Sequence, residues 1–317
     1  MKPHSTPASR TLIVNADDYA LTDGISRGIL QASQRGVVTS TSVLAVGPSF
    51  ERAAQWLADT AGIGVGIHFA LVGEDPPLLP AFQIPTLVDR RGRFPRTWKT
   101  FIRRAALGRV DPGDITRELT VQLERVRAIG HPISHVDAHQ HLQLWPLIGK
   151  TIVALATRFR VDAIRVPGVS PVRPMSLPVG TLARRLRRVA SERGLLVPER
   201  SVGIDVAGKL ERVRLRATLV RLARSRAGLV ELTVHPGAGP DPQRARYAWG
   251  YRWEDELDAL TDPSTRRLVD HLGFELATYS SARRPSRPAE HDITVEDEEP
   301  VSMASLATET SRGRHIH

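Results

Sequence analysis

The sequence predicts an α/β protein with a (β/α) barrel-like fold of seven to eight mostly parallel strands. Short apolar runs rich in β-branched residues alternate with helical patterns along most of the chain, which is typical of a parallel sheet or barrel. The chain has 317 residues, 41% of them hydrophobic, which is enough for one large core. Polar clusters also follow several of the predicted strands. An open, doubly wound sheet is the alternative architecture.

The first half of the chain contains four predicted strands and four helices. The β-rich apolar runs occupy residues 11–15, 37–45, 64–71 and 133–139. Apolar residues recur at helical spacing, or follow a helix-start signal, over residues 23–34, 49–57, 114–129 and 147–159. Thr22 or Asp23 is placed to cap the first of these helices.

A long segment, 72–109, follows the third predicted strand. It is rich in proline and arginine and weak in periodicity. Because it is too long for a simple connection, we expect an insertion that has some structure of its own and covers the substrate.

The second half of the chain continues the alternation with shorter elements. Strands are predicted at 163–166, 202–206, 229–234 and 274–278, and helices at 181–193, 210–225 and 264–271. One domain is therefore expected over residues 11–281. Residues 1–10 are expected to form a flexible N-terminus. Residues 282–317, with several prolines, an acidic run and few apolar side chains, are expected to form a disordered tail.

The composition excludes several kinds of chemistry. The chain has no cysteine, so disulfides, thiolate zinc sites and cysteine nucleophiles are excluded, and any metal must be bound through nitrogen and oxygen. No apolar run reaches the ~18 to 20 residues needed to cross a bilayer. The first ten residues lack the apolar segment of a secretory signal, so the cytoplasm is the expected compartment.

The net charge of +10 suits an anionic partner, but none of the usual nucleic-acid motifs is present, so we expect no nucleic acid. Arginines gather in two predicted helices. They are Arg184, Arg185, Arg187, Arg188 and Arg193 in one and Arg212, Arg214, Arg216, Arg221 and Arg224 in the other. These helices either rest on an anionic membrane or present solvated arginines over an apolar stripe, and the second interpretation is favoured.

Four polar clusters lie at the carboxyl ends of predicted strands. They are Asp17 with Asp18, His68, the segment 137–141, and His235. In parallel α/β proteins these ends share one edge, where active sites assemble. Aspartate and histidine suit zinc, or magnesium, manganese, iron, cobalt or nickel if the coordination is open. Ligands from three strands would leave positions for water and substrate.

Each cluster also has an ordinary structural explanation. Asp137, His139 and His141 would face one side if their strand stayed extended, but a histidine pair at this spacing is more often a hydrogen-bonded feature. His68 in VGIHFAL and His235 in LVELTVHPG are each as compatible with a core histidine as with a functional one. Their common placement favours a site.

The pair Asp17 and Asp18 needs a different explanation, because the residues that follow are better placed to cap the next helix. Adjacent carboxylates can divide the work, with one binding a metal ion and the other taking a proton from water.

Six segments together resemble the YdjC carbohydrate deacetylases, a family that includes chitooligosaccharide deacetylases and hopanoid-associated members. They are NADDYALTDG (15–24), VVTSTSVL (37–44), GIHFAL (66–71), HVDAHQHL (135–142), IRVP (164–167) and ELTVHPG (231–237). The motifs occur in the family's order and span residues 11–280. The resemblance implies a barrel-like fold and hydrolysis of a sugar N-acetyl group. It also implies a divalent metal, Mg²⁺ or Zn²⁺, held by Asp18, His68 and His139.

The same resemblance implies roles for three further residues. Asp17 matches the proton acceptor, and His235 matches a late histidine for which general acid is the natural role. Arg165 matches a motif arginine that orients the base or binds substrate. Two departures leave the shape of the pocket open: NADDFG reads NADDYA here, and Gln143 stands where the family commonly has a second histidine.

The expected reaction is metal-assisted removal of acetate from an amino sugar, with Asp17 as base and His235 as acid. The substrate is either an oligosaccharide or a glycolipid, and peripheral membrane contact and a homodimer are both compatible with the sequence. Phosphoester or glycoside hydrolysis at the same ligands is an alternative. A non-catalytic sugar-binding protein is another, although it would have little use for Asp17.

Overall fold

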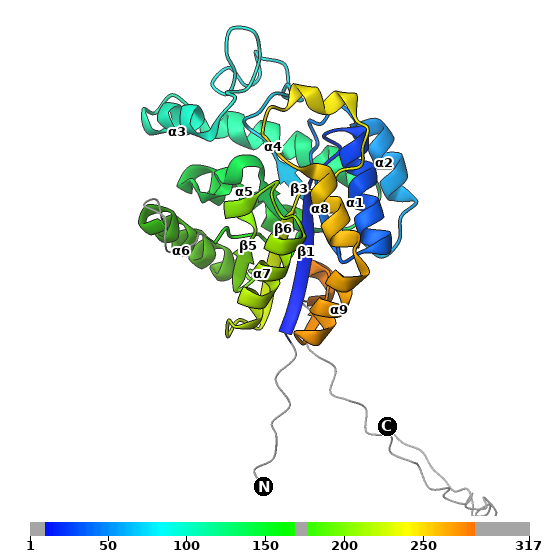
Figure 1. Ribbon diagram of the computed structural model, residues 1–317. Coiled ribbons are helices and arrows are strands. Elements are labelled where there is room, and N and C mark those ends of the chain that lie inside the picture. The colour runs from blue at the N-terminus through cyan, green and yellow to red at the C-terminus, as the bar shows by residue number, and fades with distance from the viewer. Residues whose placement is uncertain (1–9, 169–175, 283–317) are drawn as a thin grey trace, which may run out of the picture. The chain divides into compact units, whose positions relative to one another are not determined.

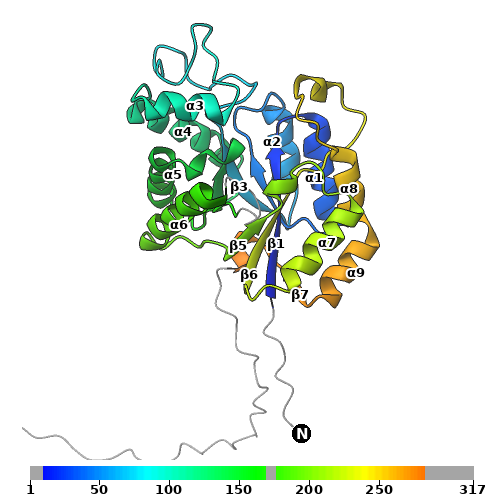
Figure 2. The ribbon, with the colours of Figure 1, turned by 60° about the vertical axis from the view of Figure 1, so that its left-hand side comes forward.

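The protein, seen here in a computed structural model that describes residues 10–168 and 176–282, is built on an entirely parallel sheet surrounded by helices (Figures 1 and 2). The strands within these residues are β1 (Arg10–Tyr19), β2 (Ser40–Val43), β3 (Gly64–Phe69), β4 (Ile133–Ala138), β5 (Arg200–Val202), β6 (Leu229–Val234) and β7 (Phe274–Leu276). Their order is β4-β3-β2-β1-β6-β5, and β7 also pairs with β1. The predicted barrel-like α/β fold is confirmed.

Isolated bridges, not a full strand, continue the curled sheet beyond β4. Val136 pairs with Ile164, and Ala163 pairs with Leu196. The predicted strand at 163–166 is therefore wrong in extent, because only two of its residues pair and Pro167 has no N–H to donate. The predicted strand at 202–206 is also displaced: β5 ends at Val202, where Gly203 turns the chain with φ of 104°.

The helices cover the outside of the sheet. They are α1 (Asp23–Arg35), α2 (Phe50–Ala58), α3 (Trp98–Ala106), α4 (Pro112–Arg127), α5 (Pro146–Phe159), α6 (Ser176–Glu192), α7 (Arg212–Ala223), α8 (Trp253–Thr261), α9 (Pro263–His271) and α10 (Tyr279–Ala282). Thr22 caps α1 by accepting from the backbone N–H of Ile25. Helix α8 has no counterpart among the predicted elements, although Trp253, Leu257 and Leu260 have helical spacing.

The strands have an apolar outer face and a largely polar inner face. On β1, the side chains of Leu12 and Val14 belong to the main hydrophobic core. The alternate residues Asn15 and Asp17 are also buried, but they make polar contacts on the other side of the strand. This two-residue alternation explains why single polar residues interrupt apolar strands throughout the sequence.

The apolar stripes of the arginine-rich helices pack inside the fold. Leu186 of α6 and Leu215 and Leu219 of α7 are buried, whereas Arg184 and Arg212 are exposed. This arrangement agrees with the solvated-arginine interpretation. None of the helices in the described ranges has the length and apolar character to span a membrane.

The remaining domain predictions concern the ends of the chain and the insertion. Residues 1–9 and 283–317 lie outside the described residues, so the expectations for both ends stay predictions. Segment 72–109 contains α3, and both views place it at the same end of the molecule as the segment that precedes α8 (Figures 1 and 2).

Candidate metal centre and active site

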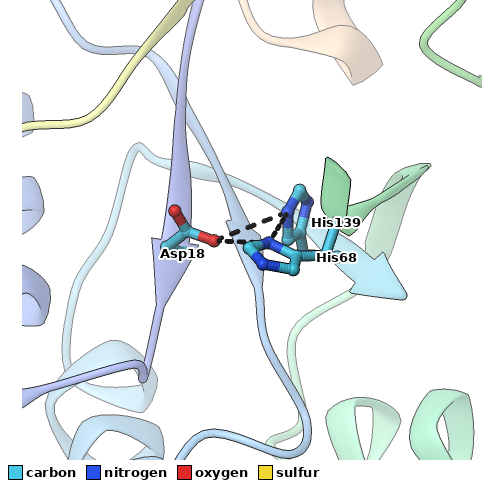
Figure 3. A group of neighbouring side chains, drawn as sticks. All are labelled: Asp18, His68 and His139. Atoms are coloured by element: carbon cyan, nitrogen blue, oxygen red, sulfur yellow. Dashed lines mark hydrogen bonds and ion pairs between the residues drawn. The ribbon is translucent and has the colours of Figure 1, made fainter. Parts of the chain in front are cut away.

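Three predicted ligands meet at the carboxyl edge of the sheet (Figure 3). Asp18 comes from β1, His68 from β3, and His139 from the residue that follows β4. Asp18 Oδ1 lies 3.5 Å from His68 Nε2 and 3.4 Å from His139 Nδ1. The two imidazole nitrogens are 3.4 Å apart. The three atoms form a nearly equilateral triangle.

The size of this triangle fits a metal ion. Ligands that are about 2.1 Å from a tetrahedral zinc ion lie roughly 3.4 Å from one another. Asp18 Oδ1 is buried and accepts no well-directed hydrogen bond, an arrangement that is costly unless a cation binds it. One carboxylate and two imidazoles therefore form a fitting donor set. Burial raises the pKa of Asp18, but His139 and His68 outweigh it and the net shift is downward.

A distortion of β1 brings both adjacent aspartates to the site. In a regular strand, Asp17 and Asp18 would point to opposite faces. The register between β1 and β2 shifts between Ala16 and Tyr19, and Asp18 adopts a φ of 66°. Aspartate tolerates this left-handed conformation better than most residues do. As a result, both carboxylates line the same cavity.

The chain turns sharply after β4, which corrects one prediction. An extended strand through 133–139 was the expected way for Asp137, His139 and His141 to share a face. Instead β4 ends at Ala138, and Gln140 and His141 have φ of 50° and 58°. His139 and His141 still reach the cavity, but the turn places them there. A turn made by two consecutive non-glycine residues in the left-handed conformation has no simple sequence pattern from which it could be predicted.

Arg165 holds Asp17 with a two-pronged ion pair. Its Nη1 and Nη2 donate to the two carboxylate oxygens of Asp17 at 2.6 Å each. Asn15 Nδ2 also donates to Asp17 Oδ1 at 2.9 Å. Burial raises the pKa of Asp17, but Arg165 and His68 outweigh it and hold that pKa well below its usual range. The carboxylate is thus ionised and fixed in orientation.

Two further carboxylates complete the surroundings of Arg165. Its Nε donates to Glu231 Oε1 at 2.7 Å, and its Nη1 lies 3.0 Å from Asp137 Oδ2. The side chain of Arg165 is 0% exposed, so it cannot contact substrate as placed. Of the two roles that the resemblance implied for Arg165, its contacts fit only orientation of the base. We call Asp17, Asp137, Arg165 and Glu231 the arginine cluster.

Asp137 also fixes the orientation of a predicted ligand. Its Oδ1 lies 2.7 Å from His68 Nδ1, and its Oδ2 accepts from Ser42 Oγ at 2.7 Å. A proton on Nδ1 leaves Nε2 of His68 free to bind a metal ion. Burial lowers the pKa of His68, but Asp137 and Asp17 outweigh it and raise the pKa to about 9.

A second acidic group, Asp17, His68 and Asp137, also has ligand atoms close enough for a metal. Its atoms already have partners, because Asp17 pairs with Arg165 and Asp137 pairs with His68 Nδ1. A metal there would compete with a buried guanidinium, so these residues fit a supporting role for the first group.

His235 follows β6 and lines the same cavity. Its backbone N–H donates to Glu256 Oε2 at 2.6 Å. Its Nδ1 is buried and has no hydrogen-bond partner within the described ranges. The residue itself is 6% exposed, so part of its imidazole borders the cavity that Asp17 and Asp18 also line.

The cavity beside these residues has a volume of about 370 Å³. Residues absent from the predicted site also line it, namely Trp98, Gln140, Ala207, Trp249 and Tyr251. Two signals could have indicated more of the site: the repeated aromatic pattern YAWGYRW at 247–253, and the lone carboxylate of Glu231 in the apolar strand LVELTV. Gln143 is fully buried and is not among the residues that line this cavity.

Comparisons with known proteins found similar sequences over most of the chain. A family model described as YdjC-like protein matches residues 11–271. A carbohydrate deacetylase of Geobacillus stearothermophilus is 32% identical over 276 residues, which cover 85% of this chain and 97% of the relative. A chitooligosaccharide deacetylase of Klebsiella pneumoniae (strain 342) is 32% identical over 281 residues, with coverage of 85% and 98%.

A solved structure has a similar fold. It belongs to an Enterococcus faecalis V583 protein described as a cellobiose-phosphate cleavage protein. The TM-score is 0.73 at 23% identity, and the match covers 86% of this chain and 99% of that one. At this identity, the likeness concerns the fold alone.

Proposed function

The chain belongs to the YdjC-like protein family, and we propose that it is a metal-dependent hydrolase that removes the N-acetyl group from an amino sugar. The observation that carries the proposal is the convergence of Asp18, His68 and His139 beside an ionised Asp17. The names of its relatives support the reaction class, since they are carbohydrate and chitooligosaccharide deacetylases.

We assign the metal to Asp18, His68 and His139. Two imidazole nitrogens favour zinc, or another ion that binds nitrogen well. They disfavour magnesium, which prefers oxygen ligands. A divalent ion in this position supplies Lewis acidity and makes a nearby water easier to deprotonate.

Asp17 is the proton acceptor in this proposal. Its low pKa keeps the carboxylate ionised at neutral pH but also makes it a weak base, so it depends on an acidified water. Arg165 holds both oxygens of Asp17 and fixes the direction from which the proton arrives. As the water oxygen bonds to the acetyl carbonyl carbon, its proton passes to Asp17.

His235 is the proton donor to the leaving amine. Its side chain is 6% exposed and lines the same cavity, so the imidazole borders the space that the sugar nitrogen would occupy. Cleavage of the C–N bond then gives acetate and a free amino sugar. The substrate is an N-acetylated oligosaccharide or glycolipid.

The test is an acetate-release screen over N-acetylated sugars and glycolipids after reconstitution with Zn²⁺, Mg²⁺ or Mn²⁺. We expect Asp17→Asn to keep its metal and to lower turnover by roughly 10² to 10⁴-fold. Asp18→Ala should lose both metal and activity, whereas Asp23→Asn, at a residue that pairs with Arg52 and does not line the cavity, should change neither.

The outcomes separate the alternatives. Near-normal turnover by Asp17→Asn would show that the base is another residue. Release of phosphate or of a reducing sugar without acetate would favour phosphoester or glycoside hydrolysis. Binding of a sugar with no product from any substrate would favour a non-catalytic binding protein.

A further inference from the structure

An aromatic array lies between the cavity and α8. Residues 247–253 contain Tyr247, Trp249, Tyr251 and Trp253 at every second position, although the chain has only 5 Trp and 4 Tyr. The ring of Trp249 lies 5.2 Å from that of Tyr247 and 5.4 Å from that of Tyr251. Tyr251 in turn lies 5.6 Å from the buried Trp253. These separations are typical of mutually packed aromatic rings.

The array borders the proposed reaction centre. The ring of Trp249 lies 5.3 Å from that of His139, and the ring of Tyr251 lies 5.0 Å from that of His235. Both aromatic side chains line the cavity. Trp249 is only partly buried, so packing within the fold does not use its whole surface. An apolar ring face thus stands next to one predicted metal ligand.

The insertion after β3 fixes this array from across the site. Trp249 Nε1 donates to Glu74 Oε1 at 3.3 Å. Asp75, which is 6% exposed, accepts from Tyr247 Oη at 2.9 Å and from Arg246 Nη2 at 2.9 Å. The loops that follow β3 and β6 are therefore joined beside His68, which lies on β3, and His235, which follows β6.

We propose that Trp249 is the platform against which the pyranose ring of the substrate stacks, held in place by Glu74 and Asp75. This proposal rests on the proposed function and adds how the sugar is recognised. A pyranose has an apolar C–H face that lies flat on an indole, while its hydroxyl groups point outward to polar side chains. Stacking on Trp249 places a sugar beside His139 and within the cavity that Asp17 and Asp18 line.

The joined loops make the platform rigid before the sugar arrives. An indole whose Nε1 already has a carboxylate partner loses little conformational freedom on binding. Asp75 is thus a positioning residue, because it touches Tyr247 and Arg246 while Trp249 touches the sugar.

The test measures sugar binding apart from turnover. Calorimetric titration of zinc-loaded Asp17→Asn chain with N,N′-diacetylchitobiose gives a dissociation constant without consuming the ligand. Adding Trp249→Ala should weaken binding by roughly tenfold or more, and Trp249→Phe should restore most of it. Asp75→Asn should weaken binding less than Trp249→Ala does. Trp56→Ala, which removes a half-buried tryptophan of α2, should leave binding unchanged.

Kinetics with Asp17 intact add a second readout. Trp249→Ala should raise KM for the acetylated sugar and leave kcat within a few-fold. The proposal would be overturned if a folded Trp249→Ala chain bound the disaccharide as tightly as before. It would also be overturned if the zinc-loaded Asp17→Asn chain with Trp249 intact did not bind the disaccharide. If sugar binding depends on Trp249 but no sugar releases acetate, the result would support stacking on Trp249 and contradict the proposed deacetylation.

Discussion

The triangle of Asp18, His68 and His139 and the arginine cluster treat their polar atoms in opposite ways, although both take residues from β1 and from β4 or the position after it. In the triangle, Asp18 Oδ1 accepts no well-directed hydrogen bond, and two histidine nitrogens face it. In the cluster, every nitrogen of Arg165 faces a carboxylate oxygen. In the triangle, the free oxygen of Asp18 can accept a ligand, whereas in the cluster the paired groups hold one another in place.

The triangle and the arginine cluster also differ in the exposure of one residue. His139 is 8% exposed and borders the cavity, whereas Arg165, Asp137 and Glu231 are all 0% exposed. Asp17 links the two groups, since it belongs to the arginine cluster and also lines the cavity beside the triangle. A fully buried charged cluster keeps its geometry only if each charge has a hydrogen-bonded partner of opposite sign.

The largest expected effect follows from removing the central charge of the cluster. Arg165→Met leaves Asp17, Asp137 and Glu231 without their cation, so we expect a loss of about 3 to 5 kcal/mol in the free energy of unfolding. Urea unfolding measures it. Arg165→Lys should lose less of the free energy of unfolding than Arg165→Met, but it should not reach the native value, because an ammonium cannot make the two-pronged pair with Asp17. A loss below about 1 kcal/mol for Arg165→Met would show that the cluster does not depend on this charge.

A smaller effect is expected on metal affinity, which distinguishes the support of the triangle from the stability of the arginine cluster. Asp137→Asn replaces the carboxylate that orients His68 with a neutral amide, so metal affinity should fall by roughly 10 to 100-fold. Competition with a zinc-binding dye measures this affinity. Glu231→Gln is the matched control, since Glu231 contacts Arg165 and Ser201. Equal losses for both variants would mean that Asp137 acts through general stability alone.

The smallest expected effect concerns His135, which lies deeper inside the sheet. Its ring stacks on Tyr279 at 3.9 Å, and burial lowers its pKa from 6.5 to about 3. Between these two values the unfolded chain holds a proton that the native chain lacks, so stability falls as the pH drops. The slope is about 1.4 kcal/mol per pH unit for one such histidine.

Unfolding free energies between pH 6.5 and 5 test this expectation. His141, with a pKa lowered to about 3 chiefly by burial, adds to the slope. His68, with a pKa raised to about 9, contributes less and less as the pH falls below 6.5, because the unfolded chain then also holds its proton. His135→Gln should reduce the slope by about one proton, and the exposed His271→Gln should not. An unchanged slope in His135→Gln would show that His135 is not the buried neutral histidine.

Sequence reasoning located most of the elements, but the ends of only some of them. The strand β6 occupies the predicted residues 229–234, because an apolar run bounded by glycine and proline has clear limits. The strand predicted at 163–166 is only a pair of bridges. The difference lies in pairing: β6 has neighbours on both sides, whereas Ala163 and Ile164 meet their partners at single positions.

The sequence by itself determined the alternation of strands and helices, the carboxyl-edge placement of Asp18, His68 and His139, and the absence of thiolate chemistry. These follow from local spacing and composition, which need no knowledge of distant contacts. Only the tertiary structure decided that Arg165 pairs with Asp17 across 148 positions of sequence and that Asp75 meets Tyr247 across 172. Such contacts depend on which strands become neighbours and on turns such as that at Gln140 and His141, so no local pattern encodes them.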